Sequence, residues 1–319
     1  MGFRRCISVV AGAVPASLLA ILFFLTYYSW PALIYNGFSF ITSNSWSLGN
    51  LYGSPITHNG FTVMPGAHYG ILFLIVGTLL STIVALVLAV PIGVAAAVFL
   101  AEAVPGVIRV WISFLVELLA AVPSVVLGLW GYAVLIPIVG HYIYPALGHA
   151  LSFLPFFRGP TGSGYGLLTA GLVLSLMIVP LIAATMRDAI VAQPMSVRES
   201  AAALGASRFE TIWRIVLPGV RQVLIGVTIL ATGRALGETM AVLMVSGNAL
   251  NYLPPNIYSP ISTMAAFIVS QLDSALQDPS GMAVRSLAEV ALVLSVISVI
   301  VNAAARLVLF GATRPTRRA

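Results

Sequence analysis

The charged residues that could do chemistry stand inside an apolar stretch. Arg234 and Glu238 are four positions apart in Gly-Arg-Ala-Leu-Gly-Glu-Thr, residues 233–239, and Arg234 follows Arg221 by 13 positions. A helix rising 1.5 Å per residue would carry Arg234 roughly 20 Å into a membrane. A charge at that depth costs about 2.5 to 3.5 kcal/mol and usually faces a bundle interior or a wet cavity. We therefore expect Glu238, one turn later on the same helix face, to pair with it.

A buried guanidinium has two uses that the sequence alone leaves open. Its planar set of donors suits a tetrahedral oxyanion, and a single Arg234 partly compensated by Glu238 would hold such an anion loosely, as a conduit requires. The alternative is an ion pair that only fixes helix packing. Glu117 is a second charge within an apolar stretch, roughly 12 Å along the same kind of helix. It either completes the network around Arg234 or pairs with Arg109 or a backbone group.

A polar segment at 194–218 interrupts the apolar chain. Its spacing predicts two short helices meeting at Gly205, a natural helix stop. We expect a capping box of Ser196 and Glu199 at the start of the first helix, and one of Ser207 and Glu210 at the start of the second. Pro218 is expected to end the second helix. One helix face is apolar and the opposite face carries Arg198, Arg208 and Arg214. On pattern alone, this pair is either a helix lying in the lipid headgroups or a docking element.

The residues of this segment resemble a known motif. The stretches 199–205, Glu-Ser-Ala-Ala-Ala-Leu-Gly, and 215–218, Ile-Val-Leu-Pro, are similar to the EAA loop of ABC-importer permeases. The resemblance implies that the corner sits in a groove of a cytoplasmic ATPase. The residues that it assigns to ATPase coupling are Glu199, Ala201, Ala202, Leu204, Gly205 and Arg208.

The composition defines the elements that must position these residues. Of the 319 residues, 60% are hydrophobic and only 8% are charged. This composition predicts an all-α polytopic membrane protein. Six apolar stretches of at least about 18 residues can each cross a bilayer core of roughly 30 Å. They lie at 7–28, 71–99, 108–129, 167–185, 223–245 and 287–310, and the apolar segment 130–144 either extends the third or re-enters.

The arginines predict the orientation. All 15 basic residues are arginine, and most of them fall in loops on one side of the predicted membrane, which the excess of positive charge in cytoplasmic loops identifies as the cytoplasm. Both termini are therefore expected to be cytoplasmic, and the net charge of +6 requires no nucleic acid partner. The predicted organisation is a retained transmembrane anchor at 1–30, an external cap at 31–69, a transmembrane domain at 70–310 that includes the coupling helices at 194–218, and a cytoplasmic tail at 311–319.

Several functions are excluded or disfavoured by what the chain lacks. It has no lysine, which the phosphate-binding loop of an ATPase requires. Cys6 is the only cysteine, and the four histidines show no metal-ligand spacing, so neither a metal site nor a catalytic site is expected. A secondary transporter driven by an ion gradient remains the alternative, because buried charges and broken helices also mark such proteins.

A second resemblance covers nearly all of 70–309. The stretch 233–242, Gly-Arg-Ala-Leu-Gly-Glu-Thr-Met-Ala-Val, is similar to the fifth-helix signature of PstC-type permease subunits of phosphate ABC importers, and 77–81, 89–93, 117–126 and 177–180 support it. The resemblance implies a MetI-like fold in a bacterial or archaeal plasma membrane. It implies a PstA-type sister permease, a cytoplasmic ATPase dimer that holds the ATP and magnesium, and an extracytoplasmic phosphate-binding protein. In that family the substrate pathway would include Arg234, Glu238, Thr239 and Glu117.

Overall fold

The computed structural model describes residues 2–58 and 60–313, which are mostly helical. Five helical segments in this part of the chain are long and apolar enough to cross a membrane. They are α1 (Gly2–Asn36), α3 (Leu72–Val98) with its π-helical continuation η1 (Phe99–Ala103), the segment Ser124–Ala150, α8 (Leu167–Val191) and α15 (Met282–Thr313). A sixth exists if α12 (Arg221–Leu236) and the helical segment Arg208–Gly219, which meet at a bend of 64°, form one broken span. The prediction of a helical polytopic membrane protein is confirmed.

The third predicted span, 108–129, is wrong. The helix α4 (Gly106–Ala120) contains 15 residues and stops before Pro123, because the residue that precedes a proline is pushed out of helical geometry. At 1.5 Å per residue, α4 is only about 22 Å long, too short for the bilayer core. The segment long and apolar enough to cross is instead Ser124–Ala150, in which helical and π-helical turns alternate as α5 (Ser124–Trp130), η2 (Gly131–Leu135), α6 (Ile136–Ile138), η3 (Val139–Ile143) and α7 (Tyr144–Ala150).

The fifth predicted span, 223–245, is not continuous. The helix α12 ends at Leu236, and α13 (Met240–Val245) begins after a non-helical break at residues 237–239. Beyond this break, α13 packs on α5 so closely that a Cβ added to Gly128 would lie 2.9 Å from the Cα of Ala241. Apolar periodicity does not reveal the break, because every residue from 240 to 245 is itself apolar.

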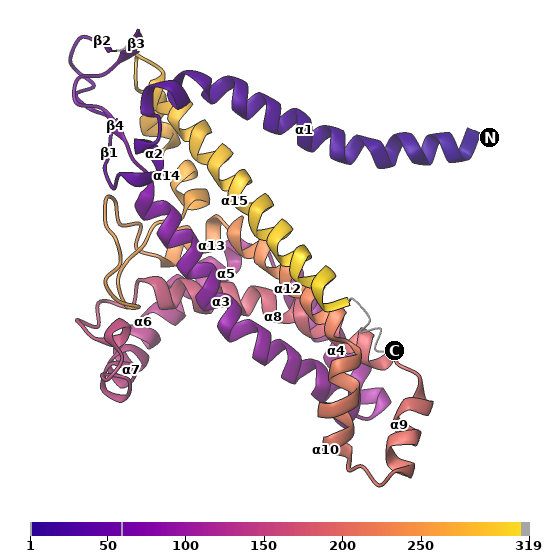
Figure 1. The fold of residues 1–319 in the computed structure, drawn as a ribbon. Coiled ribbons are helices and arrows are strands. Elements are labelled where there is room, and N and C mark those ends of the chain that lie inside the picture. The colour runs from indigo at the N-terminus through magenta and orange to yellow at the C-terminus, as the bar shows by residue number, and fades with distance from the viewer. Residues whose placement is uncertain (1, 59, 314–319) are drawn as a thin grey trace.

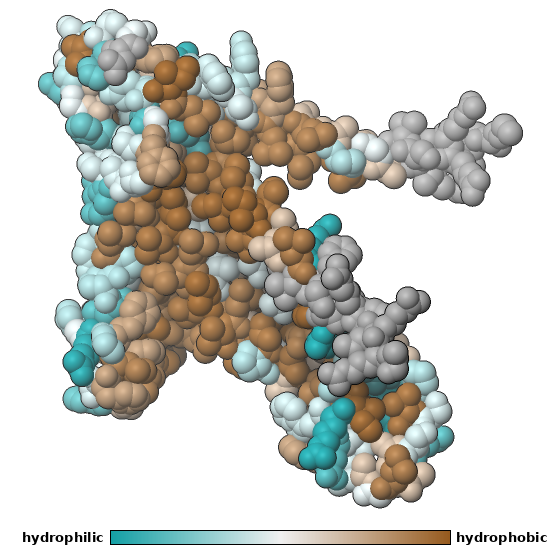
Figure 2. Space-filling model, in the orientation of Figure 1, coloured by the Kyte–Doolittle hydropathy of each residue, from teal (hydrophilic) through white to brown (hydrophobic). Residues whose placement is uncertain are grey.

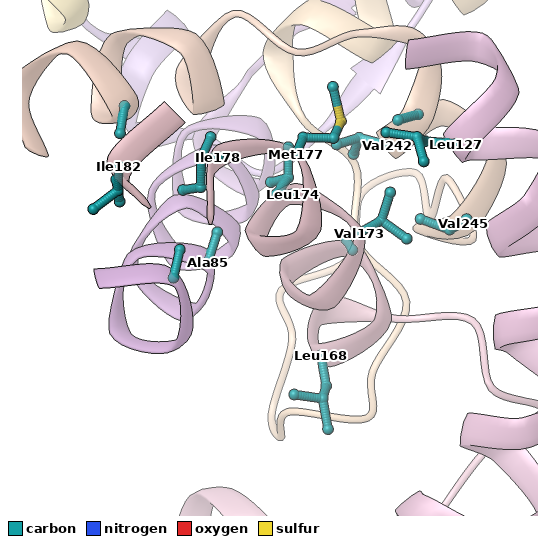
Figure 3. Packing of buried hydrophobic residues seen from close by; sticks show 14 of the residues in the cluster. Ala85, Leu127, Leu168, Val173, Leu174, Met177, Ile178, Ile182, Val242 and Val245 are labelled. Atoms are coloured by element: carbon teal, nitrogen blue, oxygen red, sulfur yellow. The ribbon is translucent and has the colours of Figure 1, made fainter. Parts of the chain in front are cut away.

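The centre of the molecule is the crossing of α3 and α8. A Cβ added to Gly93 on α3 would come within 2.7 Å of Ile182 on α8, so the missing side chain is what lets the two helices approach. Figure 3 shows Ile182, Ile178 and Leu174 following one another along α8, with Ala85 of α3 nearby. This core fixes α3 and α8 relative to each other. The segment 194–218 follows closely after α8 and packs near the end of α3.

The predicted external cap differs from its expected bounds. The helix α1 continues to Asn36, beyond the boundary expected at residue 30, and α2 (Ser39–Thr42) follows. Two small antiparallel sheets complete the cap, formed by β1 (Trp46–Ser47) with β4 (His68–Tyr69) and by β2 (Ile56–His58) with β3 (Phe61–Val63). The buried amide of Asn36 donates a hydrogen bond of 2.8 Å to Glu289 and thereby joins the outer end of α1 to α15.

The cap and the segment 194–218 lie at opposite ends of the molecule (Figure 1). That segment comprises α9 (Met195–Ala203), α10 (Arg208–Thr211), η5 (Ile212–Val216) and α11 (Leu217–Gly219). On the face shown in Figure 2, apolar residues cover most of the middle of the molecule, and polar residues gather mainly at the two ends and along one edge. The remaining elements are the turn η4 (Pro155–Phe157) and the helix α14 (Met264–Leu276), which packs beside α15. Of the predicted tail, residues 311–313 belong to α15 and residues 314–319 lie outside the described residues.

Candidate functional site

Arg234 stands in the last turn of α12 and lines a cavity of about 1120 Å³ between α1, α8, α12 and α15. Its side chain is exposed within this chain, and its guanidinium forms no hydrogen bond or ion pair with another described residue. The carbonyl end of a helix favours a cation, which offsets part of the cost of placing Arg234 at this depth. The five donors of the guanidinium are thus available to a small anion.

Glu238 does not pair with Arg234, and the predicted i, i+4 ion pair is wrong. The helix ends between the two residues, so Glu238 no longer lies one turn above Arg234 on the same face. The carboxylate instead accepts a hydrogen bond of 3.3 Å from the backbone N–H of Ala241, in the first turn of α13. The hydroxyl of Thr239 donates to the carbonyl of Gly237 at 3.3 Å. Both side chains therefore bond to the backbone at the helix break.

Glu117 is also placed differently from the prediction. Its side chain is 58% exposed, and it forms an ion pair of 3.1 Å with Arg187 at the end of α8. The proposed alternative partner, Arg109, donates instead to the backbone carbonyls of Ala101 and Val104. The structure thus brings Glu117 to a bridge between α4 and α8 and not to Arg234.

The corner at Gly205 is built as predicted, except at its first cap. Gly205 has a φ of +83°, and α9 ends in a Schellman motif, because Ala206 donates to the carbonyl of Ala201 and Gly205 donates to that of Ala202. The capping box of Ser207 and Glu210 is complete. The box predicted for Ser196 and Glu199 is not formed, since α9 begins at Met195 after Pro194 and no side chain caps it. The second helix passes Pro218 and ends at Gly219.

The corner exposes apolar side chains to solvent. Leu204 is 90% exposed and Phe209 is 68% exposed, and neither is covered by another part of this chain. Four other residues expected to contact an ATPase are also exposed: Glu199, Ala202, Gly205 and Arg208. The exception is Ala201, which is 3% exposed and packs inward, so a direct contact from Ala201 to a partner is not available in this structure. The corner therefore exposes two large apolar side chains, Leu204 and Phe209, together with the charged Glu199 and Arg208.

A charged anchor that the sequence analysis did not identify holds α9 in place. Arg198 forms an ion pair of 2.9 Å with Glu102 in η1, and the same guanidinium donates to the carbonyls of Ile190 and Gln193 at the end of α8. A cavity of about 1050 Å³ separates the rest of the corner from the end of α3. Arg198 therefore ties α9 to the ends of both central helices. A carboxylate directly after the apolar run of α3 was the available signal in the sequence.

Hydrogen bonds within the second capping box affect the titration of its carboxyl. The backbone N–H and the hydroxyl of Ser207 both donate to Glu210, at 3.0 and 2.8 Å. These bonds favour the ionised form and lower the pKa of Glu210. The start of α10 is consequently strongest when Glu210 is charged.

Two solved structures share the fold of this chain. A bacterial ABC transporter involved in the import of the acidic polysaccharide alginate matches with a TM-score of 0.56 and 17% sequence identity, over 76% of this chain and 80% of that one. The MetNI methionine ABC transporter, in an inward-facing conformation, matches with a TM-score of 0.51 and 17% identity, over 77% of this chain and 95% of that one. The fold is that of an ABC-importer permease.

Sequence comparison identifies the family. Residues 89–311 match the family described as binding-protein-dependent transport system inner membrane component. The phosphate transport system permease protein PstC 1 of Mycobacterium tuberculosis is 46% identical over 278 residues, 86% of this chain and 82% of that protein. PstC of Pasteurella multocida is 36% identical over 310 residues, 96% of this chain and 90% of that protein. The chain belongs to the PstC family of inner-membrane, multi-pass transport permeases.

Proposed function

We propose that this chain forms half of the translocation pathway of an ATP-driven importer of inorganic phosphate. The relatives named phosphate transport permeases match over nearly the whole chain, which supports phosphate as the substrate. Membership of the permease family of binding-protein-dependent systems is evidence against the alternative, a transporter driven by an ion gradient.

One observation of the structure carries the anion pathway. Arg234 lies in a large cavity without a compensating carboxylate among the described residues that line it. A guanidinium in this setting attracts an oxyanion and, as a single contact, releases it again. Glu238 and Thr239 act indirectly. Their hydrogen bonds to the backbone stabilise the break after α12 and thereby help to position Arg234. Glu117 stabilises the α4–α8 bridge and has no direct part in the pathway.

The corner at Gly205 supports coupling to a separate ATPase. Its exposed apolar residues provide the contact surface, and the bond from Arg198 to Glu102 transmits a displacement of α9 to the end of α3. In this proposal ATP binding closes an ATPase dimer, the corner moves with it, and the central helices change between outward-open and inward-open arrangements. In the same proposal the ATP and magnesium belong to the ATPase, and we expect no cofactor, metal or catalytic group in this chain; among the described residues no group of three or more His, Cys, Asp or Glu side chains could hold a metal ion.

The remaining components follow from the same proposal. A PstA-type sister permease completes the pathway, and an extracytoplasmic phosphate-binding protein delivers the anion to the side of the cap. The lipid bilayer surrounds the apolar band, both termini are cytoplasmic, and no nucleic acid takes part. The functional units are the anchor and cap, up to about residue 69, and the permease domain that follows.

Replacement of Arg234 tests the anion pathway. We expect Arg234→Ala to abolish phosphate uptake by the reconstituted complete transporter and to leave co-purification of the ATPase unchanged, because the side chain contacts substrate and not the partner. The matched control is Arg285→Ala, which removes an arginine from α15 outside this cavity. Uptake at the wild-type rate in Arg234→Ala would show that the anion contact lies elsewhere.

Replacement of Gly205 tests the coupling corner. We expect Gly205→Glu to prevent co-purification of the ATPase, because an added Cβ meets no atom of this chain within 4 Å and the new side chain would stand at the proposed contact surface. The matched control is Gly66→Glu in the cap, where φ is a similar +77° and an added Cβ also meets nothing within 4 Å. Wild-type recovery of the ATPase with Gly205→Glu would contradict docking at this corner.

A further inference from the structure

The cavity at Arg234 contains a second arginine that the sequence analysis did not connect with it. Arg306 on α15 lines the same cavity as Arg234 on α12, and Asn302 lies one turn before Arg306. None of the described residues that line the cavity is acidic. Among the described residues, neither guanidinium forms a hydrogen bond or an ion pair. Apart from Asn302, the other lining residues are apolar or glycine, so the cavity is a positively charged chamber in a mostly apolar wall.

The polar groups are arranged in sequence along the cavity. A Cβ added to Gly233 would lie 3.8 Å from the amide nitrogen of Asn302, so Asn302 sits at the level of Gly233 and Arg234. Arg306 follows four residues later on α15, about 6 Å further along the helix axis. The helix α15 runs from the cap toward the end of the molecule that carries α9 and α10 (Figure 1). Arg306 is thus nearer than Arg234 to the coupling corner.

We propose that Asn302 and Arg306 form a second oxyanion contact, which takes phosphate from Arg234 and releases it to the cytoplasm. This proposal rests on the proposed function. When phosphate moves from Arg234 to this second contact, it exchanges its hydrogen bonds with one guanidinium for hydrogen bonds from the amide of Asn302 and the guanidinium of Arg306, which are both donors. Conduction requires several sites that each bind weakly enough to let the ion leave. Two arginines at successive levels meet that requirement better than one.

The chamber recognises a tetrahedral phosphate oxyanion, and two sources could supply one. The transported ion is free inorganic phosphate, whereas the headgroup of a phospholipid could enter from the bilayer with its acyl chains along the apolar wall. The two sources can be distinguished by experiment. Free phosphate on the cytoplasmic side competes for a release site, whereas a bound lipid would co-purify with the protein.

The test uses the complete transporter in vesicles that contain ATP and increasing inorganic phosphate on the cytoplasmic side. The concentration of internal phosphate that halves uptake is measured for Arg306→Gln, Arg306→Lys and Asn302→Ala. We expect it to rise about tenfold in Arg306→Gln, to rise less in Asn302→Ala, and to return toward wild type in Arg306→Lys, which keeps the charge. Arg285→Gln, on the same helix but outside the cavity, is expected to match wild type.

The outcomes separate the two proposals. If Arg234→Ala abolishes uptake while Arg306→Gln leaves inhibition by internal phosphate unchanged, the second contact is refuted and the proposed function stands. If Arg234→Ala has no effect, the anion contact at Arg234 is refuted together with the transfer from it to Arg306. If the complete wild-type transporter takes up no inorganic phosphate, the proposed function itself fails. Loss of one co-purifying phospholipid from Arg306→Gln, measured by native mass spectrometry with inhibition unchanged, would assign the chamber to a lipid headgroup and overturn the release site.

Discussion

The charged side chains show what a sequence can and cannot specify about single residues. The distance to Arg221 placed Arg234 near the far end of a helix, as in α12, and its depth in a membrane stays a prediction; its pairing with Glu238 required a continuous helix that the fold does not provide. The partner of Glu117 is 70 residues away in the chain, in a different helix, so no local spacing could reveal it. Local hydrogen bonds such as the capping box at Ser207 were predictable, because all of their groups lie within four residues.

The capping box gives a prediction for a single residue. We expect Ser207→Ala to weaken the start of α10 by about 1 kcal/mol, since it removes the acceptor for the backbone N–H of Glu210. Hydrogen exchange of the backbone amides of residues 209–212 in the intact protein measures the effect. Ser196→Ala is the control, because Ser196 caps no helix, and it should leave that exchange unchanged.

The same box predicts a dependence on pH. The pKa of Glu210 is lowered in the folded protein, so its contribution is fully present above the ordinary value of 4.5 and is lost as the pH falls through the lowered pKa. Protection of residues 209–212, corrected for intrinsic exchange, should therefore decrease in acid below that value. A Glu210→Gln variant should not show this decrease, and an unchanged decrease in that variant would assign the effect to another group.

At the scale of elements, the length of each apolar run predicted where a helix occurs but not where that helix is interrupted. The spans corresponding to α3, α8 and α15 were located well, because each is a long apolar run with little polar interruption. The third span was misplaced because its apolar run continues across Pro123, whereas Pro123 separates two helices. The break at residues 237–239 was missed, since it depends on contacts that no single helix contains.

The close crossing of α3 and α8 predicts that adding one methyl group at Gly93 destabilises the protein. We expect Gly93→Ala to lower the melting temperature of the purified protein, with a cost of about 1 to 3 kcal/mol from overpacking. The added Cβ would lie within 2.8 Å of the Cβ of Ile182, so no change of rotamer relieves the clash and the helices must separate. Gly106→Ala, at a position open to solvent, is the control; equal melting temperatures for the two variants would refute the close contact.

For the whole molecule, charge and hydropathy together specified the arrangement with two polar ends and an apolar middle. Figure 2 shows that arrangement on one face. Described arginines stand in α4, α9 and α10, which lie together at the end opposite the cap (Figure 1). The arginines at 314, 317 and 318, which were also counted toward orientation, lie outside the described residues. Orientation therefore stays a prediction.

Cysteine labelling tests the orientation directly. In a Cys6→Ser background, Tyr52→Cys in the fully exposed tip of the cap should react with a membrane-impermeant maleimide in intact cells. Gly106→Cys at the start of α4 should react only after the membrane is permeabilised, since that end is predicted to be cytoplasmic. Labelling of Gly106→Cys in intact cells would reverse the assignment.

The interruption between α12 and α13 has a consequence for leakage. Backbone that leaves helical geometry within a bilayer must be covered by protein or face water, and Gly237 is exposed in this chain. In the proposed transporter the sister permease is the protein that can cover this break, so sealing the membrane at Gly237 depends on assembly of the two permeases. The contact between Gly128 of α5 and Ala241 of α13, by contrast, is formed within this chain alone.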